Sequence, residues 1–183
     1  MGRPFFIGDL HLGHKNIMQF GQRSMFDTIE EHDQGIMDRW NAVVTKMTDI
    51  VYVLGDVAMS LESLELLRAF NGRKVLVMGN HDHYPTEEYL KYFERVCAFE
   101  KKYHGMVFTH IPIHPQEMRF GWKWNVHGHI HALDEGVNDP RYINVNADWI
   151  NLTPVPLEEL RAECEGRLLQ YPELADLNYK SWS

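Results

Sequence analysis

Short apolar runs and amphipathic segments alternate along the chain, which is the pattern of an α/β protein. Each apolar run is rich in β-branched and aromatic residues and is bounded by glycine or polar residues. Continuous apolar runs of this length are typical of strands that are buried on both faces. Six such strands are expected, at residues 4–8, 50–54, 74–78, 105–109, 124–127 and 142–146.

Helical periodicity predicts four helices between and after these strands. Asp27 and Glu30 form a capping-box pattern that opens the first helix, in which His32 is expected to face solvent. Ser60 opens a second helix over 61–67 that stops at Asn71-Gly72, and Thr86 opens a third that runs to Val96. A final amphipathic helix is indicated by the spacing of Leu157, Leu160, Cys164 and Leu168, whereas residues 178–183 carry no clear pattern.

Composition and charge narrow the class of protein. The 183 residues are 44% hydrophobic and 24% charged, as in an ordinary globular protein, and without a linker they predict one domain over 1–183. The net charge of −8 argues against non-specific binding to nucleic acid or membranes. No apolar run approaches the roughly 20 residues of a membrane helix. Cys97 and Cys164, in no metal-binding spacing, are expected to be reduced thiols of a cytoplasmic protein.

Polar side chains with metal-binding chemistry follow each of the first five predicted strands. The carboxyl ends of strands in open α/β sheets converge on one crevice, so we expect these side chains to meet there. They are Asp9 and His11; Asp56; Asn80, His81 and Asp82; His110; and His129 and His131.

The types of these residues predict a centre with two metal ions. Nitrogen and oxygen ligands without thiolate suit Mn²⁺, the first choice here, as well as Fe²⁺, Zn²⁺ or Ni²⁺. Seven ligands exceed the four of one tetrahedral ion, and Asp56 is the natural carboxylate to bridge two ions. Such a cationic pair would attract a phosphate ester and supply a bridging hydroxide as nucleophile.

Two further residues have assignable roles next to the metal ligands. His81 is not needed as a ligand and is therefore the candidate general acid for the leaving oxygen. Asp82 either orients His81 or caps nearby backbone amides, and the sequence leaves both alternatives open.

The five motifs together resemble those of the calcineurin-like metallophosphoesterases, in that family's order. The motifs are Asp9-x-His11, Gly55-Asp56, Gly79-Asn80-His81-Asp82, a lone His110 and Gly128-His129-x-His131. The resemblance implies a four-layer αββα sandwich of two mixed β-sheets flanked by helices. It also implies that His81 is catalytic and that one ion is held by Asp9, His11, Asp56 and His131, the other by Asp56, Asn80, His110 and His129.

The compact chain is similar to the small bacterial and phage members, without an insertion long enough for a cap domain. The expected function is therefore hydrolysis of a small phosphodiester, of nucleotide or aryl type, at an open site. Two alternatives are a catalytically silent scaffold that binds a partner, and a nuclease, which the net charge disfavours. The sequence carries no signal for an oligomeric state.

Several other residues have two interpretations each. His14 either contacts the substrate phosphate or hydrogen-bonds to the backbone. His127 shares a strand face with His129 and His131, so it could take the place of one of them as a ligand in the last motif. Trp122 and Trp124 either stack on a base or aryl group or pack in the core or rim. Surface or loop positions are expected for His83, His104 and His114.

Overall fold

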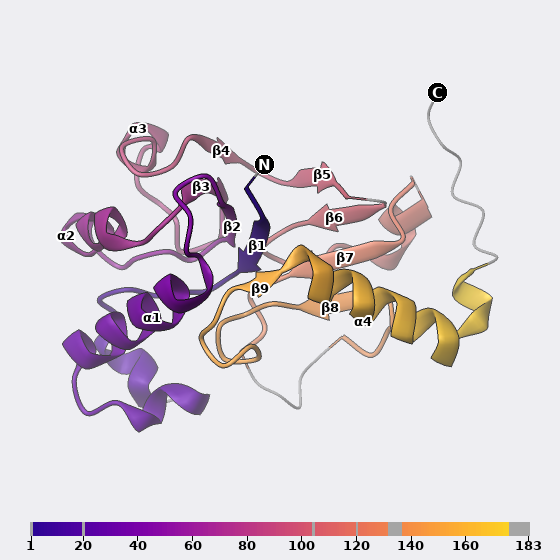
Figure 1. The fold of residues 1–183 in the computed structure, drawn as a ribbon, viewed down its shortest axis with the longest axis horizontal. Helices are drawn as coiled ribbons and strands as arrows, with labels where there is room; N and C mark the ends of the chain where they lie inside the picture. The colour runs from indigo at the N-terminus through magenta and orange to yellow at the C-terminus, as the bar shows by residue number, and fades with distance from the viewer. Residues whose placement is uncertain (1, 20, 104, 120, 132–136, 176–183) are drawn as a thin grey trace.

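The computed structural model describes residues 2–19, 21–103, 105–119, 121–131 and 137–175, so the expectations for His104 and residues 178–183 lie outside it. Two mixed β-sheets form the centre of the molecule (Figure 1). The first has the strand order β4-β3-β2-β1-β9 and the second β5-β6-β7-β8.

The first sheet is parallel except at one edge. β1 (Pro4–Ile7), β2 (Ile50–Leu54), β3 (Arg73–Val77) and β4 (Arg95–Cys97) run parallel, and β9 (Val155–Pro156) pairs antiparallel with β1. In the second sheet β6 (Met106–Phe108), β7 (Trp124–His127) and β8 (Tyr142–Asn144) are parallel, and β5 (Glu100–Lys102) is antiparallel. All six predicted strands are confirmed to within two residues.

Side chains cap the first two α-helices. α1 (Ile29–Val43) is capped by Thr28, whose hydroxyl accepts from the Glu31 amide, while the Glu31 carboxylate accepts from the Asp27 amide at 3.1 Å. The capping box is therefore one residue later than the predicted Asp27–Glu30 pair. α2 (Leu61–Leu64) begins after Ser60 as predicted and continues as the 3₁₀ helix η3 (Glu65–Ala69).

Apart from a one-turn helix at Thr86–Tyr89, the remaining helical segments are α4 (Leu157–Gln170), confirmed as predicted, and four short 3₁₀ helices. These are η1 (Lys15–Gln19), η2 (Gly21–Met25), η4 (Pro115–Arg119) and η5 (Pro172–Leu174). Among the described residues, none of the helices combines the length and apolar character that crossing a membrane requires.

The predicted helix from Thr86 to Val96 is wrong beyond its first turn. α3 covers only Thr86–Tyr89, and β4 extends the first sheet instead. The register pairs Val75 with Arg95 and Leu76 with Val96, and the Cys97 carbonyl accepts from the Met78 amide. The edge of β3 thus offers backbone hydrogen bonds that a continued helix would leave unmade, and these outweigh the helical pattern of the segment.

Two apolar cores hold the sheets in place. Between the sheets, Phe6 stacks on Phe108 with ring centroids 4.5 Å apart, and Trp124 and α4 residues such as Leu160 join this core. On the outer face of the first sheet, Trp40 and Phe70 belong to a second core beneath the helices α1–α3 (Figure 1). Two mixed sheets flanked by helices confirm the expected fold class, and Trp124 packs in the core.

Candidate metal centre

The loops that follow strands of both sheets meet at one edge of the sandwich. Asp9, His11, Asp56 and Asn80 follow strands of the first sheet, whereas His110, His129 and His131 follow strands of the second. Two groups place their donor atoms within 4.8 Å of one another: Asp9, His11 and His131, and Asp9, Asp56 and His110. Each of these groups could hold a metal ion.

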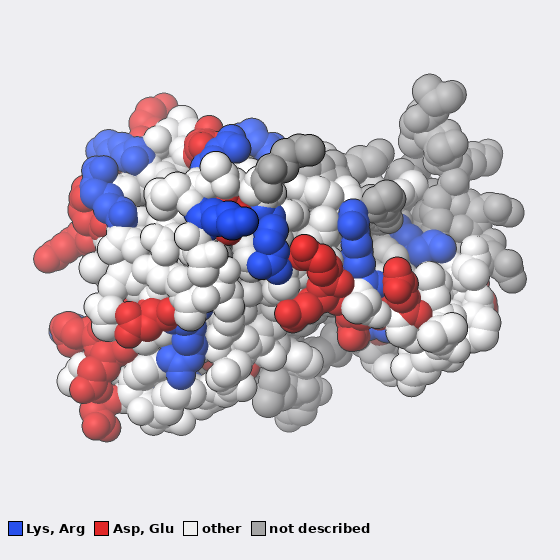
Figure 2. Space-filling view, in the orientation of Figure 1, with Lys and Arg blue, Asp and Glu red and all other residues white. Residues whose placement is uncertain are grey.

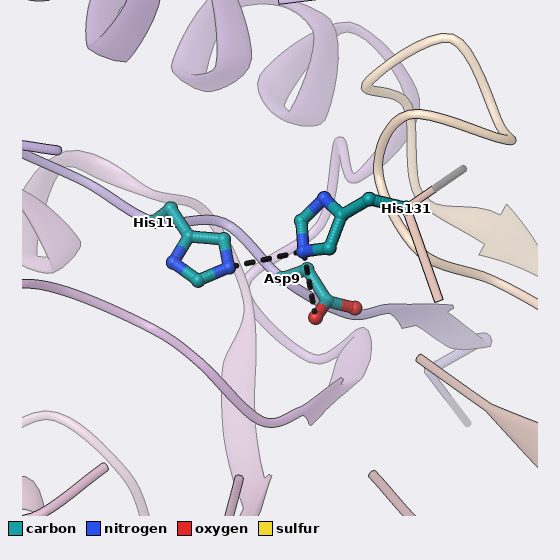
Figure 3. A group of neighbouring side chains, drawn as sticks. All are labelled: Asp9, His11 and His131. Atoms are coloured by element: carbon teal, nitrogen blue, oxygen red, sulfur yellow. Dashed lines mark hydrogen bonds and ion pairs between the residues drawn. The ribbon is translucent and has the colours of Figure 1, made fainter. Parts of the chain in front are cut away.

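The first group points its donor atoms at one place (Figure 3). The Nε2 atoms of His11 and His131 lie 3.3 Å apart, and His131 Nε2 lies 3.6 Å from Asp9 Oδ1. Two imidazole nitrogens facing each other beside a carboxylate suit a shared cation, because each brings a lone pair to the same point.

The second group shares Asp9 with the first and also approaches it through Asp56. Asp56 Oδ2 lies 3.4 Å from His110 Nε2 and 3.7 Å from His11 Nε2, so it lies between donors of both groups. His110 Nε2 is also 2.8 Å from Asn80 Oδ1 and 3.2 Å from His129 Nδ1. The structure thus brings all seven predicted ligands together.

Four of these ligands have a backbone conformation that is unusual outside glycine. The φ angles are 58° for Asp9, 49° for His11, 55° for Asp56 and 68° for His129. Left-handed backbone costs free energy in a residue with a Cβ atom, and it persists only where the surrounding structure enforces it. Strained backbone at four ligands of one cluster is the pattern of a functional site.

The glycines of the motifs leave room for the ligands. A Cβ atom on Gly79 would lie 2.2 Å from Asp56 Oδ1, and one on Gly128 would lie 2.3 Å from Asp9 Oδ2. A Cβ on Gly55 would lie 2.4 Å from His110 Nδ1. Any side chain at these positions would therefore displace a predicted ligand.

Hydrogen bonds outside the cluster orient two of the imidazoles. His110 Nδ1 lies 2.8 Å from the Leu54 carbonyl oxygen, and His131 Nδ1 lies 2.7 Å from Asp148 Oδ2. Both acceptors place the ring proton on Nδ1 and leave the Nε2 lone pair directed at the cluster. The sequence reasoning missed Asp148, although it follows the sixth predicted strand just as the other site residues follow theirs.

A buried arginine ties Asp148 to the loop of Asp9. Arg23 is fully buried, and its Nε donates to Asp148 Oδ1 at 2.9 Å. Its guanidinium also donates to the carbonyl oxygens of Asp9, at 2.5 Å, and of Leu10, at 2.9 Å. This ion pair fixes the loop on which two ligands stand.

His32 extends the same buried network, so its predicted solvent-facing position is wrong. It is fully buried, with Nε2 3.1 Å from Arg23 Nη1 and Nδ1 2.8 Å from Asp33 Oδ1. Asp33 Oδ2 in turn accepts from the Gly13 amide at 2.9 Å. The inward face of α1 thus carries polar residues as well as the apolar ones that define its periodicity, and hydrophobic patterning does not detect them.

Burial shifts the pKa of two of the ligands, Asp9 and His11. Burial, followed by the neighbouring Asp56 charge, raises the pKa of Asp9 well above its usual value. Burial, with Arg23 and His131 adding to it, lowers the pKa of His11 to about 2. His11 is therefore the neutral imidazole that metals bind. A bound cation would offset the cost of keeping Asp9 ionised, so the donor set and its electrostatics both fit divalent metal ions.

His81 and Asp82 lie beside the cluster with different surroundings. His81 is exposed, its ring centroid is 5.6 Å from that of His11, and its amide donates to Asp56 Oδ1. Asp82 is buried, and its two carboxylate oxygens accept from the amides of Asp56, Val57 and Gly79 at 2.8–2.9 Å. Among the described contacts, those of Asp82 are with backbone amides and not with His81.

The remaining described histidines outside the cluster differ in their surroundings. The His14 ring lies 5.6 Å from that of His11, and its amide donates to the His11 carbonyl oxygen. His127 is buried in β7 with its Nδ1 2.8 Å from the Gly128 carbonyl oxygen, and burial lowers its pKa to about 4. His131 instead belongs to the first metal group, and His129 Nδ1 lies 3.2 Å from His110 Nε2, which favours the later pair, His129 and His131. His83 and His114 are exposed, as expected.

Known proteins resemble the chain over most of its length. A family model described as calcineurin-like phosphoesterase matches residues 3–171. An uncharacterized protein of Methanocaldococcus jannaschii is 35% identical over 167 residues, covering 86% of this chain and 89% of that protein. The gene 66 protein of Mycobacterium phage D29 is 28% identical over an alignment of 197 residues, covering 88% of this chain and 95% of its own.

A solved structure has a similar fold. The crystal structure of a protein of unknown function from Aquifex aeolicus superimposes with a TM-score of 0.72 at 26% sequence identity. The match covers 88% of this chain and 99% of that one. The two proteins therefore share the fold over most of this chain and nearly all of the Aquifex aeolicus protein.

Proposed function

This chain belongs to the calcineurin-like phosphoesterase family, and on that premise we propose that it is a metal-dependent hydrolase of small phosphodiesters. The observation that carries the proposal is the convergence of seven nitrogen and oxygen donors from two sheets on one edge of the sandwich, five in the two metal groups and those of Asn80 and His129 beside His110. Residues 1–183 would act as one domain.

Two divalent ions, Mn²⁺ in the first place, would be held at this edge. Asp9, His11, Asp56 and His131 form one proposed ligand set, and Asp56, Asn80, His110 and His129 form the other. The position of Asp56 Oδ2 between His11 and His110 supports its role as the shared ligand. When bound, such ions polarise the phosphoryl oxygens and lower the pKa of coordinated water.

His81 would donate a proton to the leaving oxygen of the ester. Its exposure gives substrate access to the ring, and the hydrogen bond from its amide to Asp56 fixes its backbone beside the cluster. Asp82 would be a positioning residue, because it holds the amides of the loops that carry Asp56 and Asn80. His14, half-buried beside His11, would contact the substrate phosphate.

The preference for diesters rests on the access to the site, since the leaving oxygen that His81 would protonate is the same in monoesters and diesters. Asn80, His81 and His129 are exposed, so a second ester substituent can extend away from the cluster. A panel of phosphomonoesters, cyclic nucleotides and linear diesters assayed with Mn²⁺ tests this preference directly.

Replacement of His81, the proposed general acid, tests the proton transfer independently of metal binding. We expect His81→Ala to retain the metal content of the unaltered protein and to lower kcat on an aryl phosphodiester by about 10²- to 10⁴-fold, since only the proton transfer is lost. Metal analysis and steady-state kinetics measure the two quantities.

His83→Ala is the matched control, because His83 is an exposed neighbour that packs on Tyr84 instead of His11. It should leave kcat unchanged. If kcat of His81→Ala equals that of the unaltered protein, His81 is not the general acid. A Mn²⁺-loaded protein that is inert on every ester in the panel would instead favour the non-catalytic scaffold.

A further inference from the structure

An open cavity of about 440 Å³ adjoins the candidate metal centre. Asn80 and His110, two of the predicted ligands, form part of its wall, so a molecule bound at the centre can extend directly into it. The volume lies within the range of small-molecule sites, about 300–1,000 Å³. The cavity is thus a second part of the same site with room for an ester substituent.

Apolar and aromatic side chains make up most of the rest of the wall. The rings of Phe99 and Trp122 lie 6.1 Å apart at an angle of 56°. Phe99 is 53% exposed and Ile111 is 51% exposed, so both present apolar surface to solvent beside the centre. Apolar surface that stays wet in the free protein favours a ligand that covers it.

The polar groups of the wall indicate the kind of substituent. Trp122 Nε1 is buried and, among the described residues, has no hydrogen-bond partner. Glu117 adds a carboxylate acceptor. The described residues that line the cavity include no lysine or arginine, so the phosphoryl charge belongs at the metal centre and an uncharged group belongs in the cavity.

We propose that this cavity binds a planar aromatic substituent of the phosphate ester, with Trp122 and Phe99 as its specificity-determining residues. The inference rests on the proposed function and adds the class of substrate to it. A flat ring can cover the exposed face of Phe99 and contact Trp122, and π-faces stack well on aromatic side chains whatever their substituents. A nucleobase and a simple aryl group share this chemistry.

Binding of three phosphate monoesters to the Mn²⁺-loaded protein tests the proposal without relying on turnover. Calorimetry would compare phenyl phosphate and adenosine monophosphate, which carry a ring, with methyl phosphate, which does not. We expect Phe99→Ala and Trp122→Ala to weaken binding of at least one ring compound about 10-fold or more, and to change methyl phosphate binding by less than twofold.

Two further variants keep the result interpretable. Trp122→Phe retains a ring in the wall and is expected to retain most of the affinity for phenyl phosphate, even if Trp122→Ala does not fold. Leu169→Ala on α4, where Leu169 is 86% exposed, is the control for loss of an apolar side chain and should change nothing.

The outcomes separate the inference from the function on which it rests. If adenosine monophosphate binds more tightly than phenyl phosphate and the variants lose this tighter binding, the substituent is a nucleobase. The reverse order of affinities identifies an aryl group. The inference alone is overturned if all three compounds bind equally, or if neither Phe99→Ala nor Trp122→Ala weakens binding of a ring compound. Phe99→Ala decides by itself if Trp122→Ala does not fold. A loaded protein that binds none of the three overturns the inference, and one that is also inert on every ester of the panel overturns the proposed function itself.

Discussion

Asp148 connects the candidate metal centre to the buried interior. Its carboxylate lies 2.7 Å from His131 Nδ1 and accepts from Arg23 Nε at 2.9 Å. Burial acts to raise the pKa of Asp148, but the hydrogen bond to His131 and the charge of Arg23 outweigh it and hold that pKa below its usual value. Asp148 therefore presents a charged acceptor that keeps His131 in the ligand tautomer.

We expect Asp148→Asn to weaken metal affinity about 10- to 100-fold, since the neutral amide no longer orients His131 as strongly. It should also destabilise the fold, because Arg23 loses its buried counter-ion. Metal titration and thermal unfolding measure the two effects. Asp38→Asn, on the exposed face of α1, is the control. Unchanged metal affinity in a folded Asp148→Asn protein would contradict this role.

Lys74 gives the stability of the protein a pH dependence of its own. It is 7% exposed within β3, and burial lowers its pKa to about 8 from the usual 10.5. Between these two values the folded state has released a proton that the unfolded state still holds. The free energy of unfolding therefore gains up to about 1.4 kcal/mol per pH unit from Lys74 as pH rises from 8 to 10.5.

Lys74→Met should remove this gain, and it should raise stability at pH 7 because no charge is then buried. Urea unfolding of the metal-free proteins at pH 7.5 and 9.5 measures the difference. Lys46→Met, at an exposed position, is the matched control. The prediction fails if unaltered protein and Lys74→Met gain the same free energy over this interval.

At the scale of elements, the loops after the strands were easier to predict than some of the elements themselves. The positions of the ligands follow from chain order, because parallel strands end at the same edge of a sheet. β4 and β5 could not be found in the same way, since they are edge strands that carry charged residues, Arg95 in β4 and Glu100–Lys102 in β5, instead of a continuous apolar run. Their pairing depends on edges that only the folded sheets provide.

The positive φ angles at Asp9, His11, Asp56 and His129 were also beyond sequence reasoning. Local propensity disfavours this conformation in each of these residues, so it arises from tertiary contacts. The buried positions of Arg23 and His32 have the same origin, because the polar network that satisfies them joins segments far apart in the chain.

Two glycine substitutions contrast a strand end with a helix interior. We expect Gly79→Ala, after β3, to abolish most metal binding, because its Cβ would lie 2.2 Å from Asp56 Oδ1. Gly166→Ala, in α4, meets nothing within 4 Å and should retain metal while gaining about 0.5–1 kcal/mol of stability. Metal analysis and thermal unfolding of both variants provide the test, and full metal content in Gly79→Ala would contradict it.

At the scale of the whole molecule, the net charge of −8 is the first guide to which partners the surface attracts. On the face shown in Figure 2, basic and acidic side chains are interspersed. Several form ion pairs, such as Arg73 with Glu94 and Arg68 with Glu65. Together with the net charge of −8, this arrangement offers little attraction to a polyanion.

We therefore expect the KM for a small phosphodiester to change less than about threefold between 50 and 200 mM salt. A protein that contacts 6–10 backbone phosphates would lose about 10³- to 10⁵-fold in affinity over the same range. Steady-state kinetics at several salt concentrations and fixed Mn²⁺ distinguish a hydrolase of small diesters from a protein that contacts many backbone phosphates. A steep salt dependence would favour a nuclease that acts on polymers.

The contribution of ligands by both sheets has a consequence for how the molecule assembles. Asp9, His11, Asp56 and Asn80 stand on one sheet and His110, His129 and His131 on the other, so neither sheet alone carries the full set. A chain whose sheets had each formed but had docked in the wrong relative position would lack the complete set. Tight retention of metal would then distinguish correctly assembled molecules from compact misfolded ones.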